Sequence, residues 1–247
     1  RAPMRLLIRF ILGLFLLLLL FIGLAHLTGN EHLVRGVRYT YLIGRKAPEI
    51  DDRTFFPYVT IPAEAPRPWP RSKDHGDLRL GPAQEERLKA LYSTSFLVIR
   101  DDSLLFEQYF DGWTADSTVN SFSVAKSYVS VLTGIAMGEG VINSVFQPVS
   151  DFLPEFGEGC YTHINLWHLL TMSTGLDWDE SGSNPFGENA KGYYGHRVRE
   201  LSLSLPCRDS PGREFDYISG STQIMAEVLE AAYGRDLDDL VREKIWT

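Results

Sequence analysis

The sequence predicts an α+β fold preceded by a membrane-directed helix. Two apolar runs separated by a short polar turn at residues 95–113 predict a strand, a turn and a second strand. Helical patterns follow this pair. Strands that are grouped apart from the helices indicate an α+β fold rather than the repeated strand–helix units of a parallel sheet. An almost unbroken apolar run at residues 10–25 predicts the N-terminal helix.

Residues 1–26 predict a membrane anchor or a signal segment. Three basic residues crowd its start: Arg1, Arg5 and Arg9. Because basic flanks stay cytoplasmic, we expect everything after about His26 to be extracytoplasmic, either periplasmic or extracellular. Small residues at 23 and 25 fit a signal-peptidase site, whereas the length of the run favours an uncleaved transmembrane anchor.

Residues 27–80 predict a juxtamembrane stretch followed by a linker, because four prolines at residues 61–72 deny regular hydrogen bonding and favour an extended spacer. The catalytic domain is expected to span residues 81–247 and to open with a helix at 83–92. Arg100–Ser103 forms the predicted turn between the strands. Further helices are predicted at 123–137, 165–173, 220–232 and 236–245.

The composition fits a sizeable core in about one domain, with 247 residues of which 44% are hydrophobic. The net charge of −8 and the lack of a dense Lys/Arg stripe disfavour nucleic acid as a partner. The histidines show no zinc-binding spacing, so no metal is expected. Cys160 and Cys207 could form one disulfide in an oxidising compartment or remain separate thiols, and the sequence leaves both open.

Ser123 and Lys126 lie at the start of a predicted helix, in NSFSVAKSYVSVLTG. A spacing of three places both side chains on one helical face. A serine hydroxyl needs a base to become a nucleophile, and a desolvated lysine can supply it, while the helix N-terminus offers N–H groups to an oxyanion. Taken alone, the pair fits equally a helix N-cap followed by an exposed lysine.

Tyr217 lies downstream in SPGREFDYISGS, between a Pro-Gly turn and another predicted helix. A phenol can act as general base or acid where a neighbouring ammonium lowers its pKa. The alternative is a partly buried tyrosine that packs with Phe215.

These two segments and a third, HLLTMSTGLDWDE at residues 168–180, resemble the class C beta-lactamase and related serine hydrolase family over roughly residues 80–247. That family includes D-Ala-D-Ala carboxypeptidases, some esterases and 6-aminohexanoate-dimer hydrolases. The resemblance implies a beta-lactamase/transpeptidase-like fold, with an antiparallel sheet flanked by helices plus a helical subdomain.

By the same resemblance, Ser123 attacks a carbonyl, Lys126 and Tyr217 handle its proton, and an acyl-enzyme forms and is hydrolysed without a metal or organic cofactor. His168 is expected to have a packed or capping role. Trp178 is a candidate for substrate contact or for the core.

Two departures from the family pattern matter. Ser219 stands where beta-lactamases have an asparagine that binds the substrate amide; a serine lacks the paired donor and acceptor of that amide, so Ser219 is a substrate-binding candidate that weakens the beta-lactamase interpretation. The third motif, Lys-Thr-Gly or His-x-Gly, is not reached before Thr247. The chain therefore looks like a fragment whose C-terminal strands are missing, with Met4 a candidate start.

The expected function is an extracytoplasmic serine hydrolase that acts on a small amide, ester or peptide substrate. An alternative within the enzyme class is a D-Ala-D-Ala carboxypeptidase or class C beta-lactamase. A hypothesis of another class is a catalytically silent, membrane-bound binding module that retains the fold.

Overall fold

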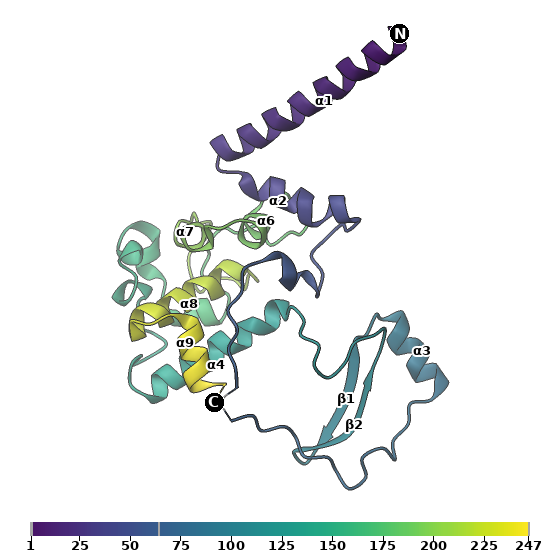
Figure 1. Cartoon of the computed structure of the whole chain (residues 1–247). Coiled ribbons are helices and arrows are strands. Elements are labelled where there is room, and N and C mark those ends of the chain that lie inside the picture. Colours follow the sequence, from purple (N-terminus) through teal and green to yellow (C-terminus); the bar gives the residue numbers. More distant parts are fainter. Residues whose placement is uncertain (1, 64, 247) are drawn as a thin grey trace.

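The computed structural model describes residues 2–63 and 65–246. The predictions that involve Arg1, Glu64 in the spacer and the chain end at Thr247 lie outside the described residues. Figure 1 shows three parts: a long N-terminal helix that projects away, a body of helices, and a two-stranded hairpin that stands apart with its own helix.

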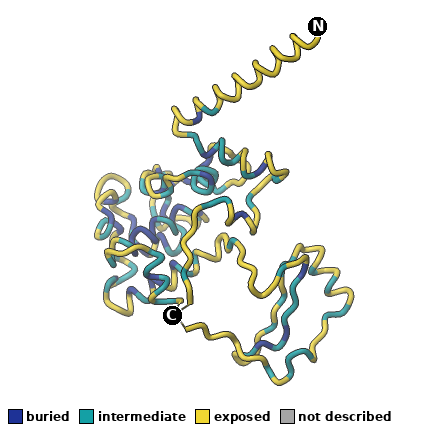
Figure 2. Tube along the Cα trace, viewed as in Figure 1, coloured by how far each residue is buried: buried dark blue, intermediate teal, exposed yellow. Residues whose placement is uncertain are grey.

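The N-terminal helix α1 spans Ala2–Leu27. Residues Pro3–Leu27 are long and apolar enough to cross a membrane, a property that a signal sequence shares. Figure 2 shows this helix exposed along almost its whole length. Helix α2 (Glu31–Tyr39) and two short 3₁₀ turns, η1 (Tyr41–Ile43) and η2 (Asp52–Phe55), connect it to the rest of the chain.

The predicted hairpin is confirmed. Strands β1 (Ser95–Arg100) and β2 (Ser103–Tyr109) pair antiparallel in a two-stranded sheet, and α3 (Pro82–Ala90) precedes them. Asp101 and Asp102 form the turn with φ values of 51° and 53°, a left-handed conformation that short polar side chains tolerate. The end of the Pro-rich segment adds to the edge of β2, because Ser72 N–H donates to the Leu104 carbonyl at 2.9 Å.

The helical body contains all four predicted helices, as η3 (Phe122–Val124) with α4 (Ala125–Gly138), α5 (Leu166–Leu170), α8 (Ser219–Tyr233) and α9 (Leu237–Lys244). Two further short helices, α6 (Glu188–Tyr194) and α7 (Val198–Leu203), were not predicted. Three 3₁₀ turns lie between α4 and α5: η4 (Val149–Asp151), η5 (Pro154–Gly157) and η6 (Gly159–His163).

Helix α8 is the centre of the core, and it contacts α4, α5, α7 and α9. Its apolar residues three and four apart are almost fully buried, as are Leu132 of α4 and Leu166 of α5. Gly220 allows the start of α8 to approach its neighbours, since a Cβ there would lie 2.7 Å from Leu205 Cδ1 and 2.8 Å from Trp178 Cε3. The site residues at the start of α8 are therefore held against a packed core.

Cys160 and Cys207 form a disulfide across 47 residues of sequence, which decides the question that the sequence left open. The bond joins η6 to the loop that precedes Tyr217. A cross-link of this span reduces the freedom of the unfolded chain and so favours the folded one.

Candidate active site

Ser123 lies in η3, directly before α4, and its side chain is exposed. Lys126 is in the first turn of α4, and its Nζ lies 3.2 Å from Ser123 Oγ. The preceding residue, Phe122, has a φ of 45°, a conformation that is uncommon for an aromatic residue. The predicted proximity of the serine and the lysine is confirmed, and the turn of chain before the serine is constrained.

Two loops bring Tyr217 and Ser219 to Ser123. The loop after α5 pairs with the loop before α8, because Asp216 N–H donates to the Met172 carbonyl at 2.8 Å and Arg208 N–H donates to the Gly175 carbonyl at 2.8 Å. Gly175 has a φ of 69°, and a Cβ there would lie 2.3 Å from the Asp209 carbonyl oxygen, so only glycine fits this approach. The three motifs that carry the resemblance thus converge.

Ser219 connects Lys126 to a carboxylate. Lys126 Nζ donates to Ser219 Oγ at 3.0 Å, and Ser219 Oγ in turn donates to Glu180 Oε1 at 2.7 Å. Ser219 N–H donates to Glu180 Oε2, also at 2.7 Å. A serine hydroxyl has one proton, so the contact with Glu180 uses the only donor of Ser219. In this structure Ser219 contacts Lys126 and Glu180 rather than presenting a free donor to a substrate.

The ring of Tyr217 faces Lys126, with Nζ 5.1 Å from the ring centroid. This is within the range of a cation–π interaction. Among residues 2–63 and 65–246, the Tyr217 hydroxyl has no hydrogen-bond partner, and the side chain is 40% exposed. The phenol is therefore close to the lysine and open to solvent.

Trp178 and His168 have structural roles near the site. Trp178 is 6% exposed and belongs to the core, so of the two positions that the sequence allowed it occupies the buried one. The capping role of His168 is confirmed: its Nδ1 accepts from Asn165 N–H at 3.2 Å, while Asn165 Oδ1 accepts from His168 N–H at 3.1 Å. Burial lowers the pKa of His168, which favours the neutral ring that this cap needs.

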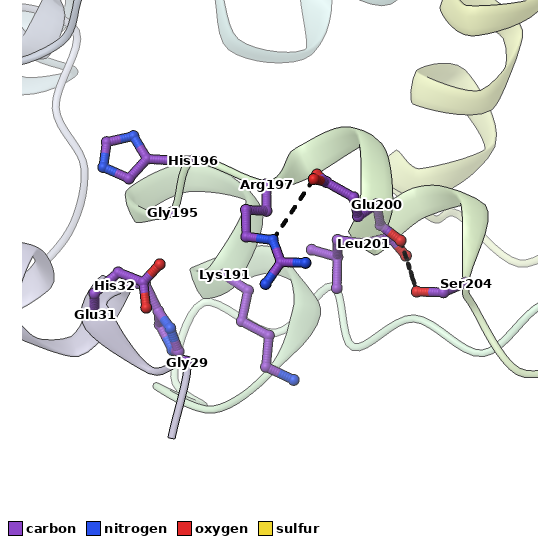
Figure 3. Close-up of a pocket in the computed structure, with 10 residues that line it drawn as sticks. All are labelled: Gly29, Glu31, His32, Lys191, Gly195, His196, Arg197, Glu200, Leu201 and Ser204. Carbon is purple, nitrogen blue, oxygen red and sulfur yellow. Dashed lines mark hydrogen bonds and ion pairs between the residues drawn. The ribbon is translucent and has the colours of Figure 1, made fainter. Parts of the chain in front are cut away.

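A cavity of about 430 Å³ adjoins Lys126 and Ser219 between α4, α8 and α9, and most of its lining is apolar. A second hollow of about 220 Å³ lies between the start of α2 and helices α6 and α7 (Figure 3). Its lining is charged, with Arg197 paired to Glu200 at 3.6 Å, and it includes none of Ser123, Lys126 and Tyr217. Lys126 and Ser219 line the first cavity, whereas Ser123 and Tyr217 do not, so we place the candidate site at the Lys126 end of that cavity.

The profile of the Beta-lactamase family matches residues 83–247, which is more than half of the chain. The chain belongs to the beta-lactamase family. This match agrees with the span of roughly 80–247 over which the sequence resembles that family, and it includes all of the convergent motifs.

Relatives of this family member include a 6-aminohexanoate-dimer hydrolase from Paenarthrobacter ureafaciens, 26% identical over 175 residues that cover 67% of this chain and 44% of the relative. A structure from Bacillus anthracis, provisionally assigned as a 6-aminohexanoate-dimer hydrolase, has a TM-score of 0.57 at 21% identity, over 66% of this chain and 46% of that one. A penicillin binding protein from Bacillus halodurans has a TM-score of 0.50 at 18% identity, over 64% of this chain and 52% of that one.

These likenesses confirm the predicted beta-lactamase/transpeptidase-like fold. The chain spans about half the length of the relatives it matches. Within the described residues, no group of three His, Cys, Asp or Glu side chains could hold a metal ion.

Glu180 is a site residue that the sequence analysis missed. It ends the middle motif, after Trp178, but nothing in that motif shows that its carboxylate contacts Ser219, 39 residues further along the chain. An acidic residue directly after Trp178 and Asp179 was the one signal in the sequence.

A second missed cluster supports the loop before Ser123. Tyr193 Oη donates to the buried carboxylate of Asp52 at 3.1 Å and accepts from Asn120 Nδ2 at 3.3 Å. Asn120 Oδ1 accepts from Phe122 N–H at 3.1 Å, and the Phe122 and Tyr193 rings stack with centroids 6.4 Å apart. Burial raises the pKa of Tyr193, so its hydroxyl stays protonated and able to donate. Asp52, in the segment between α1 and α3, is thus connected through Tyr193 and Asn120 to the chain next to Ser123.

Replacing Tyr193 by Phe is expected to lower the free energy of unfolding by about 1.5–3 kcal/mol, because a hydrogen bond to a buried carboxylate is lost. Tyr194→Phe is the matched control. The Tyr194 hydroxyl is buried with no partner among the described residues, and burial raises its pKa to about 12. Its removal is expected to leave stability unchanged or slightly higher. Chemical denaturation of both variants measures the difference, and equal losses would contradict the assigned hydrogen bond.

Proposed function

We propose that the protein is a serine hydrolase that cleaves an amide or ester bond through an acyl-enzyme on Ser123. The observation that carries the proposal is the 3.2 Å contact between Lys126 Nζ and Ser123 Oγ at a helix N-terminus in a beta-lactamase-family domain. The contact joins a weak nucleophile to a base, as covalent acyl transfer requires.

In the proposed reaction, Ser123 Oγ bonds to the substrate carbonyl carbon and passes its proton to Lys126. A neutral lysine amine has one lone pair and two protons. The lone pair accepts from Ser123 while one proton is donated to Ser219 at 3.0 Å. Lys126 then protonates the leaving nitrogen or oxygen as its bond to the carbonyl carbon breaks. Water hydrolyses the resulting ester and restores the serine.

Tyr217 is the proposed partner of Lys126 in proton handling. Its ring lies against the lysine, and the residue is 40% exposed, so its hydroxyl is open to a substrate. A phenol in this position can pass a proton to or from the amine. The apolar cavity of about 430 Å³ beside Lys126 offers room for the acyl part of a substrate.

An amide substrate is favoured by the relative from Paenarthrobacter ureafaciens, whose name describes hydrolysis of a 6-aminohexanoate dimer. Ser219 favours the same branch over true beta-lactamases. Its hydroxyl proton is donated to Glu180, so it lacks the free amide-like donor that the beta-lactamase asparagine supplies. We propose Ser219 as a positioning residue for Lys126, in contact with substrate only if the hydroxyl turns away from Glu180.

We further propose that residues 1–26 anchor the protein in a membrane and that residues 81–247 form the hydrolase domain on the extracytoplasmic side, with 27–80 between them. The span of α1 at Pro3–Leu27 supports the anchor, and Arg5 and Arg9 at its start support the orientation. The Cys160–Cys207 disulfide also supports it, since disulfides persist in oxidising compartments.

An acylating probe tests the proposal. The purified protein is offered fluorescent phosphonate, penicillin and activated-ester probes, and the labelled peptide is identified by mass spectrometry. We expect covalent label on Ser123. Label on another residue would contradict the assignment, and absence of labelling by every probe would favour a silent binding module.

Replacing Glu180 by Gln is expected to lower kcat about 10-fold to 100-fold, the equivalent of one hydrogen bond to a charged group. The amide has one acceptor where the carboxylate has two, so Ser219 would lose one of its two contacts at 2.7 Å and hold Lys126 less firmly. We expect the pH profile of kcat to shift as well, because the charge next to the Ser219–Lys126 pair is lost. Steady-state kinetics across pH measure both effects.

Asp179→Asn is the matched control. Asp179 precedes Glu180 in the chain, but its carboxylate contacts Asn184 and Ser181 and not Ser219. Its kinetics are expected to match the wild type. If Glu180→Gln lowered only the free energy of unfolding and left kcat and its pH profile unchanged, Glu180 would have a purely structural role.

A further inference from the structure

The segment that follows α1 exposes a run of large apolar side chains. Tyr41, Leu42 and Ile43 of η1 are 69%, 74% and 48% exposed, and Val37 on α2 is also exposed. Single exposed apolar residues are ordinary, but a contiguous group on a short ordered turn marks an interaction site.

The opposite side of α2 is fixed to the helical body. Gly36 lies against the Tyr194 ring, where a Cβ would be 3.5 Å from Cδ2, and Arg35 donates to the Tyr194 carbonyl at 3.4 Å. His32 Nε2 contacts the Pro185 carbonyl at 2.9 Å. The apolar group of η1 is therefore held outward by a helix that cannot turn to bury it.

The position of this group points to a lipid surface. Figure 1 shows α2 between α1 and the helical body. Helices α1 and α2 contact each other and diverge from the point where α1 ends and α2 begins. Two exposed basic residues, Arg38 and Lys46, flank the apolar run on either side in the sequence. Tyrosine, aliphatic side chains and flanking cations together are typical of segments that lie in the membrane interface.

We propose that η1 and the adjacent turn of α2, with Val37, Tyr41, Leu42 and Ile43, dock into the interface of the lipid bilayer that α1 crosses. This inference rests on the proposed role of α1 as an anchor. The apolar side chains enter the acyl boundary, and Arg38 and Lys46 reach lipid phosphates. Two points of contact, α1 and η1, then fix the orientation of the domain on the membrane.

The charged hollow of Figure 3 agrees with this arrangement. Gly29 and His32 place it beside the end of α1, and Lys191 and Arg197 contribute cations to its lining. A charged lining belongs in the headgroup or water zone, outside the acyl region. The hollow lies at the start of α2, and the apolar group of η1 follows the C-terminal end of α2.

Two tyrosines of nearly equal exposure provide a matched test. Tyr41 is 69% exposed and Tyr58, in the chain after η2, is 67% exposed. Each is replaced by Cys in the otherwise unchanged chain and labelled with the polarity-sensitive dye NBD. The natural cysteines are joined to each other and do not compete for the label. The protein is placed in nanodiscs of phosphatidylethanolamine and phosphatidylglycerol that contain lipids with a nitroxide near the headgroup.

We expect the label at Tyr41→Cys to emit at shorter wavelength and to lose most of its fluorescence to the nitroxide lipids, and the label at Tyr58→Cys to do neither. Equal spectra and equal quenching at both positions, in protein that elutes with the nanodiscs, would overturn the docking surface and leave the anchor standing. Protein that elutes apart from the nanodiscs would overturn the anchor, and the docking surface with it.

Discussion

Replacing Ser123 by Ala is expected to reduce turnover of amide and ester substrates by about 1,000-fold or more and to abolish covalent labelling. The reason is that no acyl-enzyme can form once the oxygen that bonds to the carbonyl carbon is gone. The variant is expected to fold normally, because Ser123 is exposed and, within residues 2–63 and 65–246, its one side-chain hydrogen bond is to Lys126. Steady-state kinetics and probe labelling measure the loss.

Ser127→Ala is the control for this variant. Ser127 is an exposed serine of α4, four residues after Ser123, and its variant is expected to keep wild-type kinetics and labelling. A Ser123→Ala variant that retained labelling would place the nucleophile elsewhere. Loss of labelling with thermal unfolding shifted far below that of Ser127→Ala would show misfolding instead of a lost nucleophile.

The parts of the fold that the sequence predicts are those set by local patterns. The hairpin follows from two apolar runs and a polar turn, and α4 and α8 follow from apolar residues three and four apart. Helices α6 and α7 were missed because both are short, and because Gly192 inside α6 and Gly195 at its end lower helix propensity. Tertiary contacts stabilise α6, whose Tyr194 is buried against Gly36 of α2.

The candidate site also has one part that local sequence spacing predicts and another part that it does not. Ser123 and Lys126 are three residues apart, so helical geometry alone predicts their contact. The contact between Glu180 and Ser219 spans 39 residues, and that between Asp52 and Tyr193 spans 141. Contacts at such separations depend on how loops and helices pack, and no local spacing encodes them. The carboxylate behind Ser219 and the support of Phe122 therefore needed the structure.

The Lys126→Ala variant is expected to lower kcat by about 100-fold to 10,000-fold, the range that general acid–base catalysis contributes. Lys126 Nζ lies near Ser123 Oγ, Ser219 Oγ and the Tyr217 ring, and among the described side chains it is the one that hydrogen-bonds to Ser123 Oγ. Stability is expected to change little, since the side chain is only partly buried and Lys126 is not part of the hydrophobic core. Near-normal turnover would contradict the proton transfer proposed for Lys126.

Chemical rescue separates a missing base from a displaced loop. Removal of the lysine side chain leaves space between Ser123 and Ser219, and a small alkylamine added to the buffer can bind there as a base. We expect the activity of Lys126→Ala to rise with the concentration of neutral amine, and therefore with pH, while Ser123→Ala shows no rise. Lys191→Ala is the control, because that lysine pairs with Glu188 outside the site and its loss is expected to leave kcat unchanged. A Lys126→Ala variant that no amine rescues, with Ser219 and Glu180 displaced, would indicate that the lysine acts by holding the site together rather than by carrying the proton.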